Sequence, residues 1–467
     1  MGGQGTVTIG FILWLWWLCW RCHSLPICEG VEDETPLHLL STKTGYFNAH
    51  RDGSHWEKYS EEAYKSLCLS SAGVLGEAGV ATGTPRHGTR YPTTEGIGRL
   101  LKVLPALSRR IRDNHRQDRG CLKERDVAQL TDWFTPFELR DRDQLQEMGY
   151  EEMAALGSHW LEFLPNLFNV TYDPSLFKID FTIKNRTEQS AYHFLRGMFG
   201  EDAVGNIELP RAYSPNFILK FYKACPRWLR EVYKNNETTY KERWLFTETE
   251  QFKKTIHAVS ARLGFMHPLS SNEVEAMYDE CRFETAWWPT RKSAWCTAFS
   301  FYDFEVMEYH QDLKYYYEDS YGHPLNAKTA CQTLNDIRKR FQQAVQSDGE
   351  VKPRGLLYFA HDKTVFKVMA SLGLFRPAHH LRHDNFEDMK NRVWRSSFVC
   401  PFSSNLAFVL YRCAAEHKVA VFFQGEPLPL TEICQGTVCG WEELQGWLKE
   451  KHLSCDLNTL CMLKDEL

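Results

Sequence analysis

The sequence predicts an α/β fold in which a sheet carries an α-helical insertion. Strand and helix patterns alternate at both ends of the 467 residues, whereas the middle third reads as mostly helical. Hydrophobic residues make up 43% and charged residues 25%, which is ordinary for a globular protein and excludes a mainly disordered or fibrous one. The net charge is -5, so a chain-wide nucleic-acid surface is not expected. Any anion site must be a local basic pocket.

A strand-turn-helix unit follows the first clear helix. From Asp143, apolar residues recur at three- and four-residue steps, which predicts a helix that ends before Pro165. Phe177–Ile183 (FKIDFTI) then predicts a short strand, and Gln189–Gly197 the start of another helix. The elements expected after it are helices within 215–265 and 270–346, a strand at 355–360 (GLLYFA), a helix at 363–372, and strands at 406–412 and 418–423.

The two ends of the chain carry targeting signals. The apolar run Phe11–Trp20 is shorter than the ~20 residues that span a bilayer, so residues 1–24 are expected to be a signal peptide. The last four residues, Lys464–Leu467, read KDEL, an address recognised by the KDEL receptor in the endoplasmic reticulum. The protein is therefore expected in the lumen of that compartment, partly secreted, and without a membrane span in the mature chain.

The cysteine content fits an oxidising lumen. Of 15 cysteines, Cys19 and Cys22 leave with the signal peptide, and the odd remainder predicts at least one free thiol. No CxxC pair occurs in the mature chain and the run His379–His383 matches no defined ligand spacing, so no metal site is expected. The sequons at Asn169 and Asn236 are expected glycosylation sites.

The segment Arg86–Thr93 (RHGTRYPT) carries the clearest chemistry. Two arginines flank His87, and Gly88 allows the backbone to approach a ligand closely. Guanidinium groups bind phosphate oxygens bidentately, and a neutral imidazole nitrogen can attack phosphorus. The segment predicts a phosphate site with a histidine nucleophile.

This RHGxRxPT pattern resembles the signature of the histidine acid phosphatases. Within that family the chain is similar to the multiple inositol polyphosphate phosphatases, from about Ser41 to the C-terminus. The further stretches that carry the resemblance are Ser41–Thr44 with Tyr46, Lys184–Arg186, Cys281–Cys296, Ser403–Leu406, Tyr411–Cys413 and the retention tail. The resemblance implies a phosphomonoesterase that acts on phytate and lower inositol phosphates through a phosphohistidine, without a cofactor. It also implies a mixed sheet flanked by helices, with an α-helical cap domain inserted.

On that plan the chain divides into a phosphatase core and a cap. The core comprises residues 34–110, 151–200 and 325–463, the cap comprises residues 201–324, and residues 111–150 add a helical segment to the cap. The family also pairs Cys281 with Cys296, and Cys455 with Cys461 is a second candidate pair.

The resemblance assigns a role to each site residue. His87 is the nucleophile, and Asp362 is the proton donor that the leaving alkoxide needs. The phosphate-binding residues are Arg86, Arg90, Arg186 and His361. The candidates for the remaining substrate phosphates are Lys43, Thr93, Lys184 and Lys363. Because Arg186 must face the pocket, its neighbour Asn185 is expected to stay unglycosylated despite a sequon.

Two departures from the family stand out. The triplet His361-Asp362-Lys363 replaces the usual His-Ala-Glu, which shifts the general acid to Asp362 and affects the expected preference among ring positions. The stretch Leu69–Pro85 should contain a central strand, yet it has four glycines and ends in proline. Either the strand is unusually weak or the sequence is locally wrong.

Two other functions stay open. One is a general histidine acid phosphatase for smaller esters such as 2,3-bisphosphoglycerate, which needs fewer cations around the site. The other is a pseudophosphatase that binds phosphorylated ligands without turnover, which damage to the strand before Arg86 or loss of a usable acid would favour.

Overall fold

The computed structural model describes residues 35–49, 77–204, 207–347, 352–413, 416–452 and 455–463. The expected signal peptide and KDEL signal lie outside these residues, as does the stretch 69–76. Within the described ranges, no helix is long and apolar enough to cross a membrane. The fold is of the expected α/β class, with one mixed sheet and many helices.

Seven strands form the sheet: β1 (Glu77–Pro85), β2 (Phe177–Phe181), β3 (Gly355–Phe359), β4 (Asn405–Cys413), β5 (Glu416–Phe423), β6 (Glu426–Pro427) and β7 (Val438–Gly440). Their order is β2-β3-β1-β4-β5-β6, with β7 paired to β5. β3 is parallel to β1 and β2, whereas β4 is antiparallel to β1 and β5. The strand that leads into Arg86 and His87 is therefore central.

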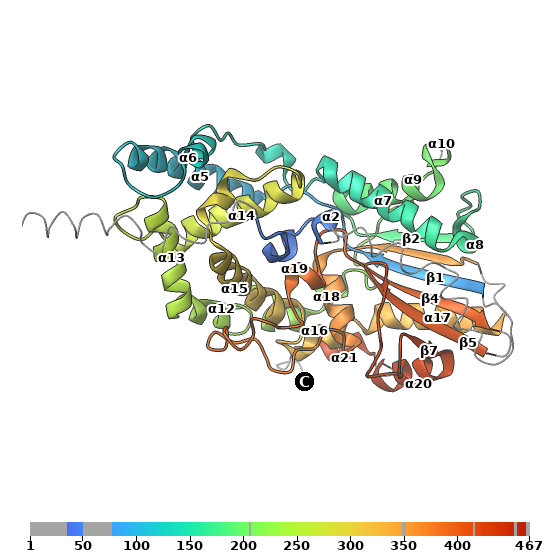
Figure 1. The fold of residues 1–467 in the computed structure, drawn as a ribbon. Helices are drawn as coiled ribbons and strands as arrows, with labels where there is room; N and C mark the ends of the chain where they lie inside the picture. The colour runs from blue at the N-terminus through green and yellow to red at the C-terminus, as the bar shows by residue number, and fades with distance from the viewer. Residues whose placement is uncertain are drawn as a thin grey trace, which may run out of the picture.

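Helices cover both faces of the sheet (Figure 1). One face carries α7 (Glu147–Phe163), α8 (Pro165–Phe168) and α9 (Asn185–Phe199), and the other carries α17 (Cys331–Gln346) and α20 (Trp441–His452). Side chains of β3 alternate between the two cores, as strand geometry requires. Leu357 and Phe359 pack with α7 and α9, whereas Leu356 and Tyr358 pack in the core on the opposite face.

A helical region extends from one end of the sheet, at the left of Figure 1. It contains α5 (Thr94–His115), α6 (Glu124–Thr131), α12 (Lys241–Thr247), α13 (Glu250–Arg262), α14 (Ser271–Trp287) and α15 (Phe301–Asp319). Its core is aromatic, and the rings of Tyr278, Trp287 and Tyr309 are fully buried. The helical middle of the chain is thus as the sequence predicts.

The remaining helices are short apart from α18, the helix expected after β3. They are α2 (Tyr46–Ala49), α10 (Glu201–Val204), α11 (Pro226–Glu231), α16 (Pro324–Thr329), α18 (Asp362–Ser371), α19 (Ser396–Val399) and α21 (Leu457–Cys461), with the 3₁₀ turns η3 (Leu37–Leu39), η4 (Ser41–Lys43), η6 (Leu139–Asp141), η7 (Phe221–Ala224) and η8 (Ala294–Ala298).

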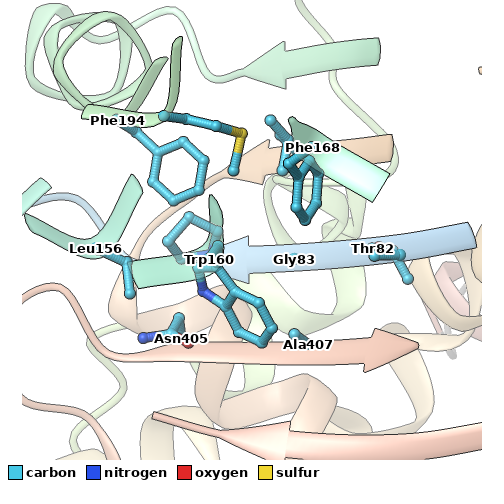
Figure 2. Close-up of a pocket in the computed structure, with 12 residues that line it drawn as sticks. Thr82, Gly83, Leu156, Trp160, Phe168, Phe194, Asn405 and Ala407 are labelled. Atoms are coloured by element: carbon cyan, nitrogen blue, oxygen red, sulfur yellow. The ribbon is translucent and has the colours of Figure 1, made fainter. Parts of the chain in front are cut away.

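β1 forms a full strand despite its small residues. It pairs with β3 and β4, and Pro85 stands at its last position, where the Pro85 carbonyl accepts a hydrogen bond from the Ala360 amide at 2.9 Å. The small side chains leave a void of ≈ 20 Å³ between the strand and the helices above it. Figure 2 shows Trp160, Phe168 and Phe194 gathered over this part of the sheet, beside Gly83. The pairing of β1 thus depends on its neighbours more than on its own side chains.

One expected disulfide is present and the other is wrong. Cys281 is bonded to Cys296, as expected. Cys455 is bonded to Cys331 and Cys461 to Cys225, because α21 begins between the two cysteines and carries Cys461 to α11 while Cys455 stays beside α17. A further bond joins Cys434 to Cys439. Among the described residues Cys400 is a free, buried thiol, in agreement with the odd cysteine count.

Candidate active site

Two parallel strands deliver two histidines to one edge of the sheet. β1 and β3 run parallel, and a further bridge joins Arg86 to Ala360 just beyond them. The next residues are His87 and His361, and the amide of His87 donates to the carbonyl of Ala360 at 3.1 Å. The two imidazole rings lie with centroids 5.4 Å apart. Topology thus brings together residues that are far apart in sequence.

A buried carboxylate shapes the loop after β1. Glu152 of α7 accepts hydrogen bonds from the Thr89 amide at 2.8 Å and the Thr89 hydroxyl at 2.9 Å. It also accepts from the Tyr46 amide and the Ser403 hydroxyl, each at 2.9 Å. Sequence reasoning missed this residue, whose only signal was a glutamate on the apolar face of a helix.

The loop also lies against the backbone of α7. A Cβ atom at Gly88 would lie 2.4 Å from the carbonyl oxygen of Gly149, closer than any real contact. Glycine at position 88 therefore permits a close approach between this loop and α7, whereas the approach to a ligand expected from the motif stays a prediction.

Hydrogen bonding determines which nitrogen of His87 carries the proton. Its Nδ1 lies 2.9 Å from the carbonyl oxygen of Gly88, which can only accept a hydrogen bond. The neutral ring therefore carries its proton on Nδ1 and keeps a lone pair on Nε2. Burial, followed by the charges of Arg186 and Arg86, lowers the pKa of His87 well below its usual value, so the ring is neutral and nucleophilic.

Three arginines surround this ring with donors left over. Arg86 is fully buried and uses Nη1 for the carbonyls of Thr42 and Cys400, both at 2.7 Å. Asp143 accepts from Arg186 Nη1 at 3.2 Å and lies 3.9 Å from Arg90 Nη1. Buried atoms here that have no hydrogen-bond partner among the described residues are Nε and Nη2 of Arg86, Nε of Arg90, Nε of Arg186 and Nδ1 of His361.

Such a gathering of buried, unpaired groups is unusual, because buried polar atoms are nearly always hydrogen-bonded. Burial, then Arg186, lowers the pKa of Arg90 to about 10, which reflects how closely the cations are crowded. The arrangement is suited to a compact, multiply charged anion.

His361 and Asp362, which follow β3, lie beside the same groups. Nε2 of His361 lies 2.8 Å from the Thr182 hydroxyl, and Asp362 Oδ2 lies 3.9 Å from Arg86 Nη2. Burial favours the protonated form of Asp362, but Arg86, Lys363 and Lys43 outweigh it and hold the pKa well below its usual range. The Asp362 carboxylate is thus ionised as long as no anion binds near those cations.

A cavity of ≈ 780 Å³ opens beside these groups, between the sheet edge and the helical region. Lys43, Thr93 and Lys363 line it, as do Arg90, Arg186 and Asp362, whereas Lys184 is exposed and does not. Lys363 is already paired with Glu318 at 2.9 Å and Asp319 at 3.0 Å. Arg282, which sequence reasoning missed, lines the same cavity. No group of His, Cys, Asp or Glu within the described ranges is arranged to hold a metal ion.

Comparison with known proteins agrees with this chemistry. Residues 85–424 match the Histidine phosphatase superfamily (branch 2). The chain is 28% identical to multiple inositol polyphosphate phosphatase 1 of Drosophila melanogaster, over 77% of this chain and 76% of the relative. It is also 28% identical to multiple inositol polyphosphate phosphatase 1 of Homo sapiens, over 81% and 80%.

Two solved structures share the fold. The phytase from D. castellii superimposes with a TM-score of 0.67 at 17% identity, over 83% of this chain and 82% of that one. The multiple inositol polyphosphate phosphatase of Bifidobacterium longum, in complex with inositol hexasulfate, gives 0.64 at 14% identity, over 89% and 98%.

Proposed function

Because this chain belongs to the Histidine phosphatase superfamily (branch 2) and is a phosphoric monoester hydrolase of the histidine acid phosphatase type, we propose that it hydrolyses inositol polyphosphates through a phosphohistidine on His87. The observation that carries this proposal is the cluster of buried, unpaired donors on Arg86, Arg90, Arg186 and His361. A phosphoryl group supplies the oxygens that these donors lack.

In the first step, Nε2 of His87 attacks phosphorus. A bond forms between Nε2 and phosphorus as the ester bond between phosphorus and the inositol oxygen breaks. The arginines stabilise the negative charge on the other phosphoryl oxygens. The Thr182 hydroxyl donates a hydrogen bond to Nε2 of His361, so the proton of that ring is on Nδ1. Nδ1 of His361 can therefore donate a hydrogen bond to one of the phosphoryl oxygens.

Asp362 gives its proton to the leaving alkoxide. A bound phosphate brings negative charge against Arg86, Lys363 and Lys43, the cations that depress the pKa of Asp362 in the free site. Substrate therefore raises that pKa and favours the protonated donor. In the second step the Asp362 carboxylate takes a proton from water, the oxygen of that water attacks phosphorus, and the N–P bond breaks to release phosphate.

We assign Lys43, Thr93 and Lys363 of the cavity wall to the other phosphates of the substrate, whereas Lys184, exposed outside that wall, stays a prediction for them. Lys43 is buried at the cavity wall, where burial and then Arg90 lower its pKa well below its usual value, so an added anion there is favoured. A cavity of this size with cations on several sides favours an inositol polyphosphate over a small ester such as 2,3-bisphosphoglycerate. The intact nucleophile and acid favour an enzyme over a pseudophosphatase.

We also propose that the enzyme works in the lumen of the endoplasmic reticulum, retained through its KDEL signal. Four disulfides among the described residues support an oxidising compartment. Asn169 and Asn236 are exposed and accessible to glycosylation. Asn185, also exposed, is proposed to stay unmodified, and glycopeptide mapping of the active enzyme tests this.

Two variants test the mechanism. His87→Ala should abolish phosphate release from phytate, because it removes the nucleophile. Asp362→Asn should slow phytate hydrolysis by roughly 10²–10⁴-fold and affect p-nitrophenyl phosphate much less, because nitrophenolate leaves without a proton. Substantial phytate turnover by His87→Ala contradicts the covalent mechanism. Equal losses on both substrates for Asp362→Asn exclude it as the proton donor.

A further inference from the structure

A second group of cations lies beside the phosphoryl site, and it includes no residue of the RHGxRxPT motif. Lys220 is half-buried, and Lys184 and Lys223 lie near it on the surface. Charge interactions link Lys220 to both of them, to Arg186 and to His361. Lys220 is therefore close enough to Arg186 and His361 for its charge to act on both.

The backbone around Lys220 is fixed from two sides. Asn216 donates to Asp180 of β2 at 3.1 Å and accepts from the Leu219 amide at 2.7 Å. The carbonyl of Leu219 accepts from the Thr364 hydroxyl of α18 at 2.6 Å. The segment before η7 is thus tied to β2 and α18, the elements that position Arg186 and Asp362.

These lysines lie outside the residues that line the cavity of ≈ 780 Å³, and like Lys43 of the cavity wall they have no counter-charge among the described residues. In the described part of the chain, Lys184, Lys220 and Lys223 form no ion pair, and Lys223 lies over the ring of Tyr233 at 3.3 Å. By contrast, Lys363 has two carboxylate partners. Three neighbouring cations without a carboxylate are unfavourable unless an anion joins them.

We propose that Lys220, supported by Lys184 and Lys223, binds the phosphate on the ring carbon next to the one being cleaved. This inference rests on the proposed function. A phosphate held by Arg186 and His361 has its vicinal neighbour within reach of the adjacent cationic group, whereas a phosphate across the ring points elsewhere in the cavity. Lys220 therefore makes the enzyme prefer substrates with vicinal phosphates.

The preference has a pH signature. Burial, followed by Lys184, Arg186 and Lys223, lowers the pKa of Lys220 to about 8. A lysine loses its charge as the pH rises through its pKa, so the advantage of vicinal substrates in kcat/KM declines above about pH 8. Lys220→Arg, which stays charged, should keep the preference and remove the decline.

The decisive experiment compares a vicinal inositol bisphosphate with its non-vicinal isomer, which carries the same charge. Lys220→Met should raise KM for the vicinal isomer about tenfold or more and leave the non-vicinal isomer and p-nitrophenyl phosphate nearly unchanged. Lys253→Met is the matched control, because Lys253 is ion-paired with Glu248 at 3.0 Å on α13, in the helical region. An equal loss on both isomers, or no loss on either, overturns the assignment.

Binding separates this inference from the proposed function. Calorimetric titration of both isomers onto His87→Ala, with and without Lys220→Met, reports the subsite without turnover. If the wild type releases no phosphate from any inositol phosphate, the proposed function fails, while loss of the vicinal preference in binding still supports the subsite. If Lys220→Met leaves binding of both isomers unchanged, the subsite is wrong even in an active enzyme.

Discussion

The two ends of the cavity hold similar numbers of arginines in opposite states. At the sheet edge, Arg86, Arg90 and Arg186 crowd one another and keep unpaired donors. At the α14 end, Arg99 and Arg282 contact Asp279, and Arg243 donates to Glu275 at 2.5 Å. The difference shows that arginine content alone does not mark a phosphate site. A single unfilled donor does not mark one either, because Arg282 also keeps a buried Nε without a partner. The marker is the convergence of several such donors beside His87 and His361.

The largest expected effect comes from exchanging one arginine at each end for methionine. Arg186→Met should lower kcat/KM on phytate by roughly 10²–10³-fold, because it removes a donor aimed at the developing charge. Arg243→Met should cost about tenfold or less in activity. It should instead lower the free energy of unfolding by about 1–3 kcal/mol, because Glu275 loses its closest partner. Steady-state kinetics and denaturant unfolding of both variants measure the contrast, and similar kinetic losses would remove the distinction.

Lys363 is intermediate between the unpaired and the carboxylate-paired cations. It is adjacent to Asp362, the proposed proton donor, yet it is paired with Glu318 and Asp319. We expect Lys363→Ala to raise KM for phytate several-fold, an effect of the size of one ion pair, and to lower kcat less. Loss of the ammonium should also raise the pKa of Asp362 and move the alkaline limb of the kcat profile to higher pH. An unchanged KM and an unchanged pH profile would show that Lys363 serves only the packing of α15 and α18.

The smallest expected effect is on stability, and it concerns two glutamates of α14. Within α14, Glu275 is surrounded by arginines and has a lowered pKa, whereas Glu280 is fully buried beside Glu284, and its pKa is raised well above its usual value by burial and then by that neighbour. A raised folded-state pKa contributes stability below the unfolded pKa, and this is lost as the pH rises. Glu280→Gln should therefore add about 1 kcal/mol or more at pH ~7 and little at pH ~4, measured by urea unfolding. An equal gain at both pH values would contradict the burial of an ionisable acid.

Local sequence predicted most of the architecture and pointed to the residues that are proposed to react. The apolar run GLLYFA predicted β3, and the RHGxRxPT motif singled out His87 because the residues of the motif are adjacent in the chain. Glu152 and Lys220 escaped detection, since a glutamate in a helix and a lysine in a loop look solvated until the fold surrounds them. The Cys455–Cys461 pairing was wrong for the same reason, because short spacing says nothing of a helix between two cysteines.

The four glycines before Arg86 raised doubt about the central strand. β1 forms because β3 and β4 supply hydrogen bonds on both sides and α7 to α9 supply the apolar cover. This stabilisation of β1 comes from segments far away in the sequence, so the residues around β1 alone do not predict it.

The disulfides of the C-terminal segment also bear on how the protein is made. Cys225–Cys461 and Cys331–Cys455 span 236 and 124 residues, and their second cysteines lie in the last described stretch. A ribosome must therefore deliver almost the whole described chain before either crosslink can close. In the lumenal location proposed above, Cys225 and Cys331 would enter the oxidising compartment before their native partners, exposed to oxidoreductases and to mispairing. Correct pairing of these cysteines thus depends on oxidation late in synthesis or after it.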